Sequence, residues 1–472
     1  MARFEEILTT IDGYVWGWLL ILLVLLTGIY LSFRTGFVQI FHLGKALKYM
    51  VQNEDDGEGE VTSFGALCTA LSATVGTGSI VGVATAICIG GPGALLWMLI
   101  AAFFGMTTKY AEGVLAILYR KDDGNGHYLG GPFMYIEKGL GEKWKWLAKM
   151  FAIFAIFAGL LGTGTMTQIN GITASIEGFF DPDRSHVAFQ LFGKDITYAV
   201  VIGGAIITFF AALVIIGGIK RIASVSEKIV PFMCIIYIAI AVIVLISNFR
   251  ELPEAIALVF RTAFSEKAAA GAVVGGTVKL AMQMGIGRGV FSTEAGLGSA
   301  PIAVAAACTK EPVRQGLVSM SGTFDTVLIC AMTGLSIIVT GAYNVPSIEG
   351  VGVTTYAWQK SLPWPPEISA FLLMACLSMF AFTTILGWDY YTERCMEYLT
   401  NGNKVALTIF RVLYIAAIFV GPYLALDTVW TISNICNGLM AFPNLIALIA
   451  LGGVVSKATK DFFQREKEKR KK

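Results

Sequence analysis

Charged side chains are scarce in this sequence. Asp, Glu, Lys and Arg make up 14% of its 472 residues, whereas soluble domains contain about a quarter. Hydrophobic residues reach 56%, and the mean hydropathy is +0.69. Ten-residue segments that alternate between polar and apolar residues, as in a transmembrane β-barrel, are absent. The composition therefore excludes an ordinary soluble domain and predicts an all-α polytopic membrane protein.

Residue patterns that carry enzyme chemistry are also missing. The three histidines lie far apart, and the eight cysteines fall mostly inside apolar segments without a C-x-x-C pair. Neither H-E-x-x-H nor the nucleotide-binding pattern G-x-x-x-x-G-K-[ST] occurs. These absences argue against an enzyme, a zinc site and an ATP-driven pump. No feature indicates a nucleic-acid partner or an obligate protein partner.

Eleven segments are apolar and long enough to cross a bilayer, because a membrane helix needs about 20 mainly apolar residues. The first lacks a basic leader and a cleavage site of small residues, so we interpret it as a retained helix. The prediction is therefore eleven transmembrane helices, at about 14–33, 61–88, 93–119, 146–179, 196–217, 226–248, 266–300, 316–342, 367–399, 403–424 and 427–453.

Lys and Arg residues are concentrated in every second loop. Because cytoplasmic loops carry this excess, we expect a multi-pass protein of the cell membrane with its N-terminus outside and its C-terminus in the cytoplasm. Residues 1–60 would form an extra N-terminal helix and an acidic linker, followed by a ten-helix core at 61–453. We interpret the basic tail at 454–472 as a disordered charged segment without a specific partner, with an anchor near anionic lipid headgroups as the alternative.

Two of the ten core helices carry paired glycines near their middle. The stretch TVGTGSIVG at 74–82 contains Gly76 and Gly78, and the sixth core helix contains Gly285 and Gly287. A glycine-interrupted helix at the start of each half is typical of transporters built from inverted repeats. We therefore expect both helices to be unwound at these glycines.

The predicted repeats are five helices each, at about 61–248 and 266–453. An alternative stays open for the first break, because Gly78 and Gly82 also form the G-x-x-x-G pattern of close helix packing. An ion channel is a second alternative that uses broken helices. A channel normally shows a repeated filter or a pore symmetry, and neither is visible in this sequence.

An unwound helix at bilayer depth exposes main-chain groups that must find new partners. Free N–H groups at the start of a half-helix suit a carboxylate. Carbonyl groups at the end of a half-helix suit an ammonium group or a sodium ion. Groups of both kinds lie close together at such a break, so the predicted ligand is a zwitterion, namely an amino acid.

Three motifs resemble the alanine/glycine:cation symporter family, also called the sodium:alanine symporters. They are GGPGALLWMLIAAFFG (90–105), RGVFSTEAGLGSAPIA (288–303) and FTTILGWDYYTERCMEYL (382–399). The resemblance covers about 60–450, and the first motif departs slightly, with Leu96 and Leu99 where the family favours aromatic residues. The family is similar in architecture to the LeuT fold, a five-plus-five inverted repeat, which here would follow one extra N-terminal helix.

The resemblance implies uptake of a small neutral amino acid, alanine or glycine, driven by a sodium gradient with sodium as the co-transported ion. The implied substrate site has the unwound centres of the first and sixth core helices at its heart. Its expected residues are Gly76, Thr77, Gly78, Ser79, Thr165, Gln168, Asn170, Gln283, Met284, Gly285, Ile286, Thr384 and Trp388. Trp388, Met284 and Ile286 would cap a small pocket, although ordinary helix packing is an alternative for each of the three.

The resemblance also implies a sodium site between the first and eighth core helices. Its oxygen ligands would be the carbonyls of Ser72 and Val75 and the hydroxyls of Thr383 and Thr384, in keeping with a hard cation. Asp325 marks a possible second cation site, or else a structural partner for a basic residue. A proton-coupled or facilitative amino acid carrier of the same fold remains the alternative function.

Overall fold

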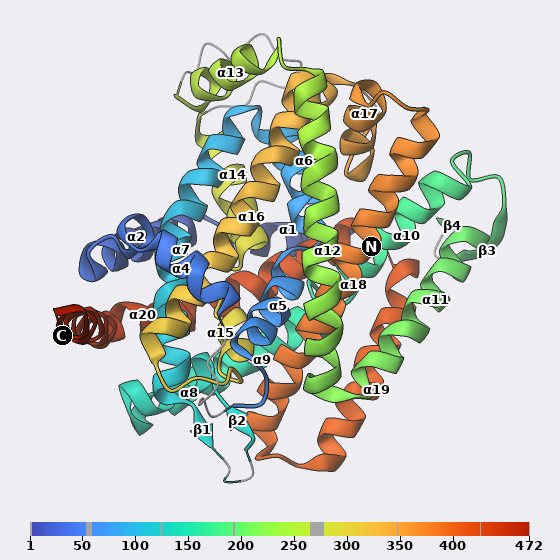
Figure 1. Ribbon diagram of the computed structural model, residues 1–472. Helices are drawn as coiled ribbons and strands as arrows, with labels where there is room; N and C mark the ends of the chain where they lie inside the picture. The colour runs from blue at the N-terminus through green and yellow to red at the C-terminus, as the bar shows by residue number, and fades with distance from the viewer. Residues whose placement is uncertain are drawn as a thin grey trace.

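The computed structural model describes residues 2–52, 59–122, 124, 126–191, 194–264, 278–346, 348–424 and 426–471. The described chain is mostly helical, and its long helices form one bundle (Figure 1). Nine helices are long and apolar enough to cross a membrane, or ten when the bent pair α5 and α6 is taken as one span, within these residues. This confirms a multi-pass helical membrane protein, while the predicted total of eleven and the five-plus-five repeat stay predictions.

The first half of the predicted core begins with the broken pair. Its helices are α5 (Ser63–Thr74), η1 (Thr77–Ser79), α6 (Val81–Gly90), α7 (Gly93–Tyr119), α8 (Pro132–Leu140), η2 (Glu142–Trp144), α9 (Lys145–Leu161), α10 (Met166–Phe180), α11 (Tyr198–Ile215) and α12 (Gly218–Ser247). Two short antiparallel hairpins lie in its loops, β1 (Lys121–Asp122) with β2 (Tyr128–Leu129), and β3 (Val187–Leu191) with β4 (Lys194–Thr197).

The second half has a similar succession of helices. They are α13 (Leu252–Phe264), α14 (Val278–Thr293), α15 (Ala300–Val304), α16 (Pro312–Thr340), η4 (Ala342–Asn344), α17 (Val351–Ser361), α18 (Pro366–Thr400), α19 (Lys404–Val420), η5 (Gly421–Tyr423) and α20 (Leu426–Lys471). The predicted span at 266–300 begins outside the described residues, because 265–277 are not described.

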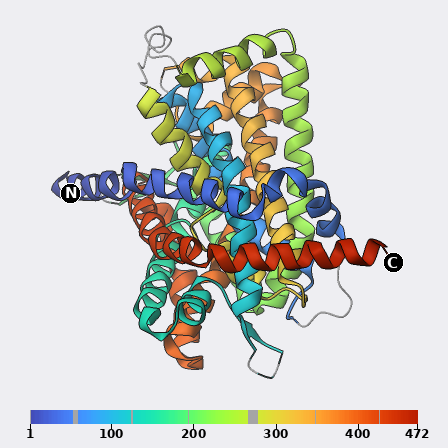
Figure 2. The same ribbon diagram turned by 90° about the vertical axis from the view of Figure 1, so that its left-hand side faces the viewer.

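The N-terminal helices α1 (Ala2–Val15) and α2 (Trp18–Thr35) pack along α20 in the same direction. The Trp16 indole donates a 2.7 Å hydrogen bond to the carbonyl of Asn434, and the Ser456 hydroxyl donates a 2.6 Å bond to the carbonyl of Arg34. Figure 2 shows these helices side by side, crossing the direction of α12. The short helices α3 (Val38–Phe41) and α4 (Leu43–Val51) follow.

The basic tail is helical, which corrects the expectation of a charged segment without fixed structure. Helix α20 continues without interruption into the tail. Lys45 pairs with Glu466, and Arg465 lies 2.9 Å from Glu311. The Phe463 ring also stacks on His42, with 3.9 Å between the ring centroids. These contacts hold the tail against the N-terminal helices and the start of α16.

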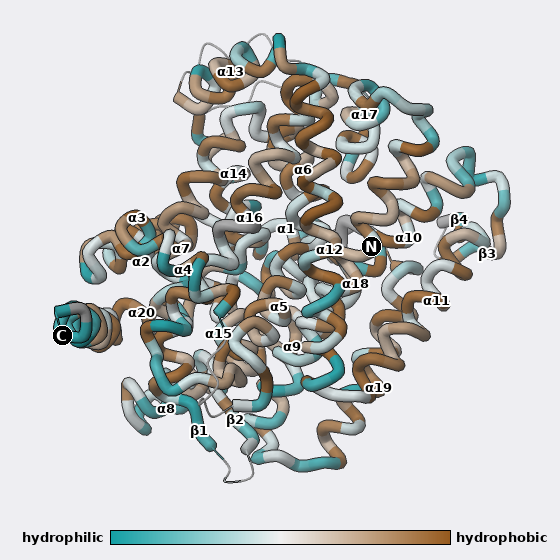
Figure 3. Tube along the Cα trace, viewed as in Figure 1, coloured by the Kyte–Doolittle hydropathy of each residue, from teal (hydrophilic) through white to brown (hydrophobic). Residues whose placement is uncertain are grey.

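Close helix packing makes up the centre of the bundle. A β-carbon on Gly113 of α7 would lie 3.0 Å from the Cα of Gly316 on α16, so the two backbones meet where neither residue has a side chain. Small residues allow this approach between membrane helices, where packing replaces the hydrophobic effect. Apolar residues dominate the long helices in Figure 3, and hydrophilic residues gather around β1 and at the end of α20.

Candidate functional site

The first predicted break is present. Helix α5 ends at Thr74, Gly76 has an extended backbone with φ −126° and ψ −152°, and the one-turn helix η1 precedes α6. The two half-helices bend by 61° at this point. This confirms the interruption expected within 74–82. It also leaves main-chain groups without their helical partners in the buried centre of the bundle.

Gly76 is needed because another side chain occupies the space beside it. A β-carbon there would lie 2.4 Å from the hydroxyl oxygen of Thr384 and 3.1 Å from Oε1 of Gln168. That amide oxygen accepts a 3.2 Å hydrogen bond from the N–H of Thr77. The Thr77 hydroxyl is buried and has no hydrogen-bond partner among the described residues. Gln168 on α10 and Thr384 on α18 therefore both reach the break, as the sequence suggested.

Two other predicted residues, Thr165 directly before α10 and Asn170 within it, hydrogen-bond to backbone carbonyls away from Gly76. The Thr165 hydroxyl donates a 2.8 Å hydrogen bond to the carbonyl of Leu160, at the join between α9 and α10. The Asn170 amide donates a 2.7 Å bond to the carbonyl of Gly421, at the start of η5. These two contacts stabilise helix ends rather than the opened backbone at Gly76.

The second break was predicted in the wrong place. Helix α14 runs without interruption through Gly285 and Gly287, and the chain leaves the helix only after Thr293. A β-carbon on Gly285 would lie 2.3 Å from the carbonyl oxygen of Ala94, so this glycine lets α14 approach α7. The actual break lies at 294–299, where Glu294, Gly296 and Gly298 have φ of 53°, 88° and 82°.

The shift moves four predicted residues away from the break. Gln283, Met284, Gly285 and Ile286 lie inside α14, and Met284 is nine residues, about 13 Å of helix, before its end. The Met284 Cβ lies 3.1 Å from where a β-carbon on Gly90 would be, at the far end of α6. The structure therefore does not bring Met284 to the pocket cap that the sequence suggested.

Trp388 lies in a different place from Met284. Its side chain packs on α9 and the α9–α10 join, within 3.3 Å of positions that β-carbons on Gly159 and Gly164 would take. Its indole nitrogen lies near the carboxyl group of Glu294, but neither Nε1 of Trp388 nor Oε1 of Glu294 completes a hydrogen bond within the described part. Trp388 is thus close to the actual second break, and the proposed lid with Met284 is wrong.

Two residues that the sequence analysis missed face the first break from α14. The hydroxyl groups of Ser79 and Ser292 are 3.0 Å apart, and Ser292 also lies 3.1 Å from the sulfur of Cys330. The Phe291 ring carbon Cδ1 is 3.0 Å from where a β-carbon on Gly78 would be. The glycine pair at 296–298, only a few residues further on, was the signal that could have located this end of the helix.

Oxygen atoms of α5 and α18 converge beside the first break. The Thr384 hydroxyl donates to the carbonyls of Ser72 and Phe380, at 2.9 and 3.0 Å, and the Thr383 hydroxyl is also 3.0 Å from the Phe380 carbonyl. Val75 is the residue at which α5 ends. Neutral oxygens of this kind suit a hard monovalent cation. The sequence analysis found all of these residues except Phe380.

Two further charged residues, Asp325 and Arg288, belong to the long helices α16 and α14. Asp325 belongs to α16, but its side chain lies outside the described part of the structure. Among the described residues, no group of three or more His, Cys, Asp or Glu side chains could hold a metal ion. The Arg288 guanidinium lies 5.2 Å from the centre of the Trp430 ring and is attracted to Asp12 of α1.

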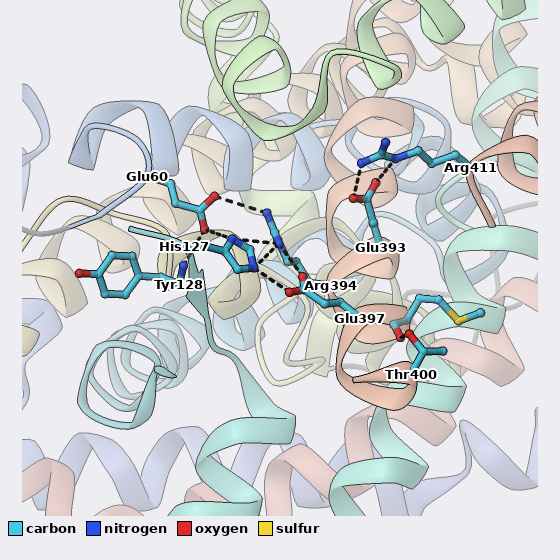
Figure 4. A network of polar contacts seen from close by, with 9 residues as sticks. Glu60, His127, Tyr128, Glu393, Arg394, Glu397, Thr400 and Arg411 are labelled. Carbon is cyan, nitrogen blue, oxygen red and sulfur yellow. Dashed lines mark hydrogen bonds and ion pairs between the residues drawn. The ribbon is translucent and has the colours of Figure 1, made fainter. Parts of the chain in front are cut away.

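A polar network joins three separate parts of the chain, just before α5, at β2 and at the end of α18 (Figure 4). The His127 ring lies between two carboxylates, 3.1 Å from Glu60 and 2.7 Å from Glu397. Arg394 contacts the same two carboxylates at 3.4 and 2.5 Å. Hydrogen bonds to Glu397 and then to Glu60 raise the pKa of His127 to about 9. The network therefore ties the start of α5 to α18 while His127 carries its proton.

Comparisons with known proteins show the family to which this chain belongs. The chain matches the model of the family described as "Sodium:alanine symporter family" over residues 1–472. It is 48% identical to an uncharacterized transporter of Haemophilus influenzae, covering 98% of this chain and 97% of that protein. It is 42% identical to the sodium/alanine symporter AgcS of Methanococcus maripaludis, covering 99% of each chain.

Among solved structures, the chain is similar to MhsT in complex with L-phenylalanine. The TM-score is 0.52 with 14% sequence identity, and the match covers 85% of this chain and 98% of that chain. At this identity the likeness shows the fold alone, and that fold is the LeuT-like one expected from the sequence.

Proposed function

The chain belongs to the sodium:alanine symporter family, and from this premise we propose that it is a secondary active symporter that takes up a small neutral amino acid, alanine or glycine, with sodium. The family is one of transporters and not of enzymes. Uptake proceeds by alternating access, with the substrate bound beside the two breaks.

One observation carries the proposal: the opened backbone at Gly76 lies between the side chains of Gln168 and Thr384. The N–H of Thr77, which Gln168 holds in this structure, is the proposed donor to the substrate carboxylate, with the positive end of a helix dipole behind it. The buried Thr77 hydroxyl, which has no protein partner in the described chain, faces the same region. These groups suit a zwitterion better than a fully charged or an apolar ligand.

The substrate size follows from what surrounds the break. The Phe291 ring lies against Gly78, and the Ser79 and Ser292 hydroxyls meet beside it. We propose that a ring this close to the opened backbone limits the substrate to a short aliphatic side chain. Alanine and glycine are therefore the proposed substrates, with Phe291 taking the limiting role that the sequence analysis gave to Met284 and Ile286.

Sodium is proposed to bind where α5 meets α18. Its ligands would be the carbonyls of Ser72, Val75 and Phe380 with the hydroxyls of Thr383 and Thr384. A cation there stabilises the end of α5 against α18 and so favours the closed arrangement of the break. This links ion binding to substrate binding, because Thr384 also touches the position of Gly76.

The proposed location is the cell membrane, with the N-terminus outside and the C-terminus in the cytoplasm. The helices α1 and α2 pack parallel to α20, which supports the proposal that the first and last segments cross the membrane in the same direction. The division into 1–60, 61–453 and 454–472 is part of the proposal.

Uptake of labelled alanine by proteoliposomes tests the function. An inward sodium gradient is expected to drive accumulation above the outside concentration, and replacing sodium with potassium abolishes it. Accumulation that needs no sodium would instead support a proton-coupled carrier. Equilibration without accumulation would indicate a facilitative carrier, and either result refutes sodium-driven symport.

A further inference from the structure

Three ionisable side chains are buried together where α7 passes the second break. Lys109 and Glu112 lie one turn apart on α7, and Glu294 is the first residue of the break. Their exposed fractions are 5%, 1% and 1%. Ionisable groups buried at bilayer depth are costly and usually serve a function. We call Lys109, Glu112 and Glu294 the buried charge cluster.

Each carboxyl group of the cluster is only half satisfied. Oε1 of Glu112 accepts a 2.7 Å hydrogen bond from the Asn444 amide, and Oε2 of Glu294 accepts a 2.6 Å bond from the Ser299 hydroxyl. The second oxygen of each carboxyl is buried and completes no hydrogen bond among the described residues, although the Gly296 main chain approaches Glu112 and the Trp388 indole approaches Glu294. A charged carboxyl oxygen that is buried without a hydrogen-bond partner is energetically costly. Protonating the carboxyl group avoids this cost.

The charges of the cluster do not balance. Lys109 is attracted to both carboxyl groups, first to Glu294 and then to Glu112. The other titratable groups that act on them are phenols, Tyr135 of α8 and Tyr391 of α18, which are neutral. The Asn444 amide of α20 and the Trp388 indole of α18 carry no charge either. With all three members ionised, the cluster would therefore hold one uncompensated negative charge.

We propose that the buried charge cluster binds one exchangeable proton, shared between the carboxyl groups of Glu112 and Glu294. Taking up H⁺ from water changes the net charge of the cluster from minus one to zero. The proposal rests on the proposed transport function, because Glu294 belongs to a break that reshapes during transport. The arrangement in which Glu112 and Glu294 are buried holds the proton, and opening of the break to water releases it.

A cavity lies between Lys109 of the buried charge cluster and the end of α5. Its volume is about 20 Å³, and it is lined by Lys109, Thr293, Ser319, Thr323 and Thr74. It has room for about one water molecule. The Ser319 and Thr323 hydroxyls are buried and without partners in the described chain. Because Thr74 is the last residue of α5, Lys109 and the edge of the first break line the same cavity, although Glu112 and Glu294 do not.

A sodium ion fits this position less well than a proton. Sodium needs several oxygen ligands and a space that holds it. The cavity beside the cluster is lined by the Lys109 side chain, whose positive charge repels a cation. A proton needs no cavity and bonds directly to a carboxyl oxygen, so it satisfies the charge balance without a change in packing.

The experiment compares alanine binding to the purified protein, at saturating sodium, across a range of pH. The closed state holds the extra proton, so binding weakens on the alkaline side by up to about tenfold per pH unit. In Glu294→Gln, which cannot ionise, sodium-dependent binding remains and this pH dependence disappears. Glu254→Gln is the matched control, because Glu254 is exposed on α13, and it keeps the wild-type profile.

A second readout does not depend on binding. Infrared spectra of the wild type are expected to contain a protonated carboxyl band near neutral pH that is lost in Glu294→Gln or Glu112→Gln. Wild-type binding that is independent of pH, with no such band, overturns the proposal. A Glu294→Gln variant whose sodium dependence changes while its pH dependence stays also overturns it, because the site then holds sodium. Loss of sodium-dependent binding by the wild type refutes the transport function instead.

Discussion

The hydroxyl of Thr384 on α18 donates a 2.9 Å hydrogen bond to the carbonyl of Ser72 near the end of α5. This contact joins two helices at the point where one of them is broken. The same hydroxyl occupies the space beside Gly76, so the proposed ion site and the proposed substrate site share one side chain.

The first prediction concerns that hydroxyl. Thr384→Val removes one oxygen and keeps the shape of the side chain, and loss of one such polar contact costs about 1.4 kcal/mol, or a factor of about ten. We expect the sodium concentration for half-maximal uptake to rise about tenfold. Thr384→Ser keeps the oxygen and is expected to stay near the wild-type value. Equal sodium dependence in Thr384→Val and the wild type would contradict the assigned ligand.

The second prediction concerns the glycines of the first break. Gly76→Ala places a β-carbon 2.4 Å from the Thr384 hydroxyl, which neither helix can accommodate without moving. Uptake is expected to fall more than about tenfold, because the opened backbone loses its geometry. Gly82→Ala is the control, since its nearest neighbour is the end of a flexible side chain, Arg288 Cδ at 4.0 Å. Comparable uptake by both variants would show that the break tolerates side chains.

The third prediction concerns substrate size. Phe291→Ala removes the ring that lies against Gly78, so larger neutral amino acids gain room. Leucine or methionine is expected to compete with labelled alanine in the variant and not in the wild type. Phe157→Ala on α9 is the control, because that ring is 45% exposed on the outer surface of the bundle. Unchanged selectivity in Phe291→Ala would remove Phe291 from the pocket wall.

The fourth prediction concerns pH and the network around His127. Its pKa is raised in the folded protein from 6.5 to about 9. The resulting stabilisation is therefore complete below about pH 6.5 and is lost as the pH rises through about 9. The thermal unfolding midpoint is expected to fall between pH 7 and pH 10 in the wild type and to fall less in His127→Gln.

His186 provides the control for this measurement, because its side chain is 75% exposed. His186→Gln is expected to keep the wild-type decline with pH. A decline of the same size in His127→Gln would show that another group causes it. The variant also loses the contacts to Glu60 and Glu397, so its midpoint at pH 7 is expected to lie below that of the wild type.

The helices themselves were predictable because hydrophobic length is a local property. Most predicted spans correspond to helix in the described residues, while the total of eleven stays a prediction and the start of the span at 266–300 lies outside them. The interruption at Gly76 was visible as small polar residues within an apolar segment. The second interruption was misplaced for a physical reason. One span contains two glycine pairs, Gly285 with Gly287 and Gly296 with Gly298, and nothing local distinguishes a packing glycine from one with positive φ.

The candidate site was predictable in part. Gln168, Thr384 and Ser72 were found because the resemblance to the family located them. Phe291 and Ser292 were missed because they follow from the position of the second break. Trp388 was assigned to the pocket through Met284, whereas it lies beside Glu294. Its true neighbour depends on the packing of α9 and α18, which no sequence pattern describes.

By itself, the sequence determined that this is a membrane protein of the symporter family, where most of its long helices lie, and that one of them is interrupted by small polar residues. These follow from composition, segment length and motif, which are properties of neighbouring residues. Only the tertiary structure decided which groups meet. Thr384 and Ser72 are 312 positions apart, and Ser79 and Ser292 are 213 apart. Contacts over such separations depend on how whole helices pack against one another.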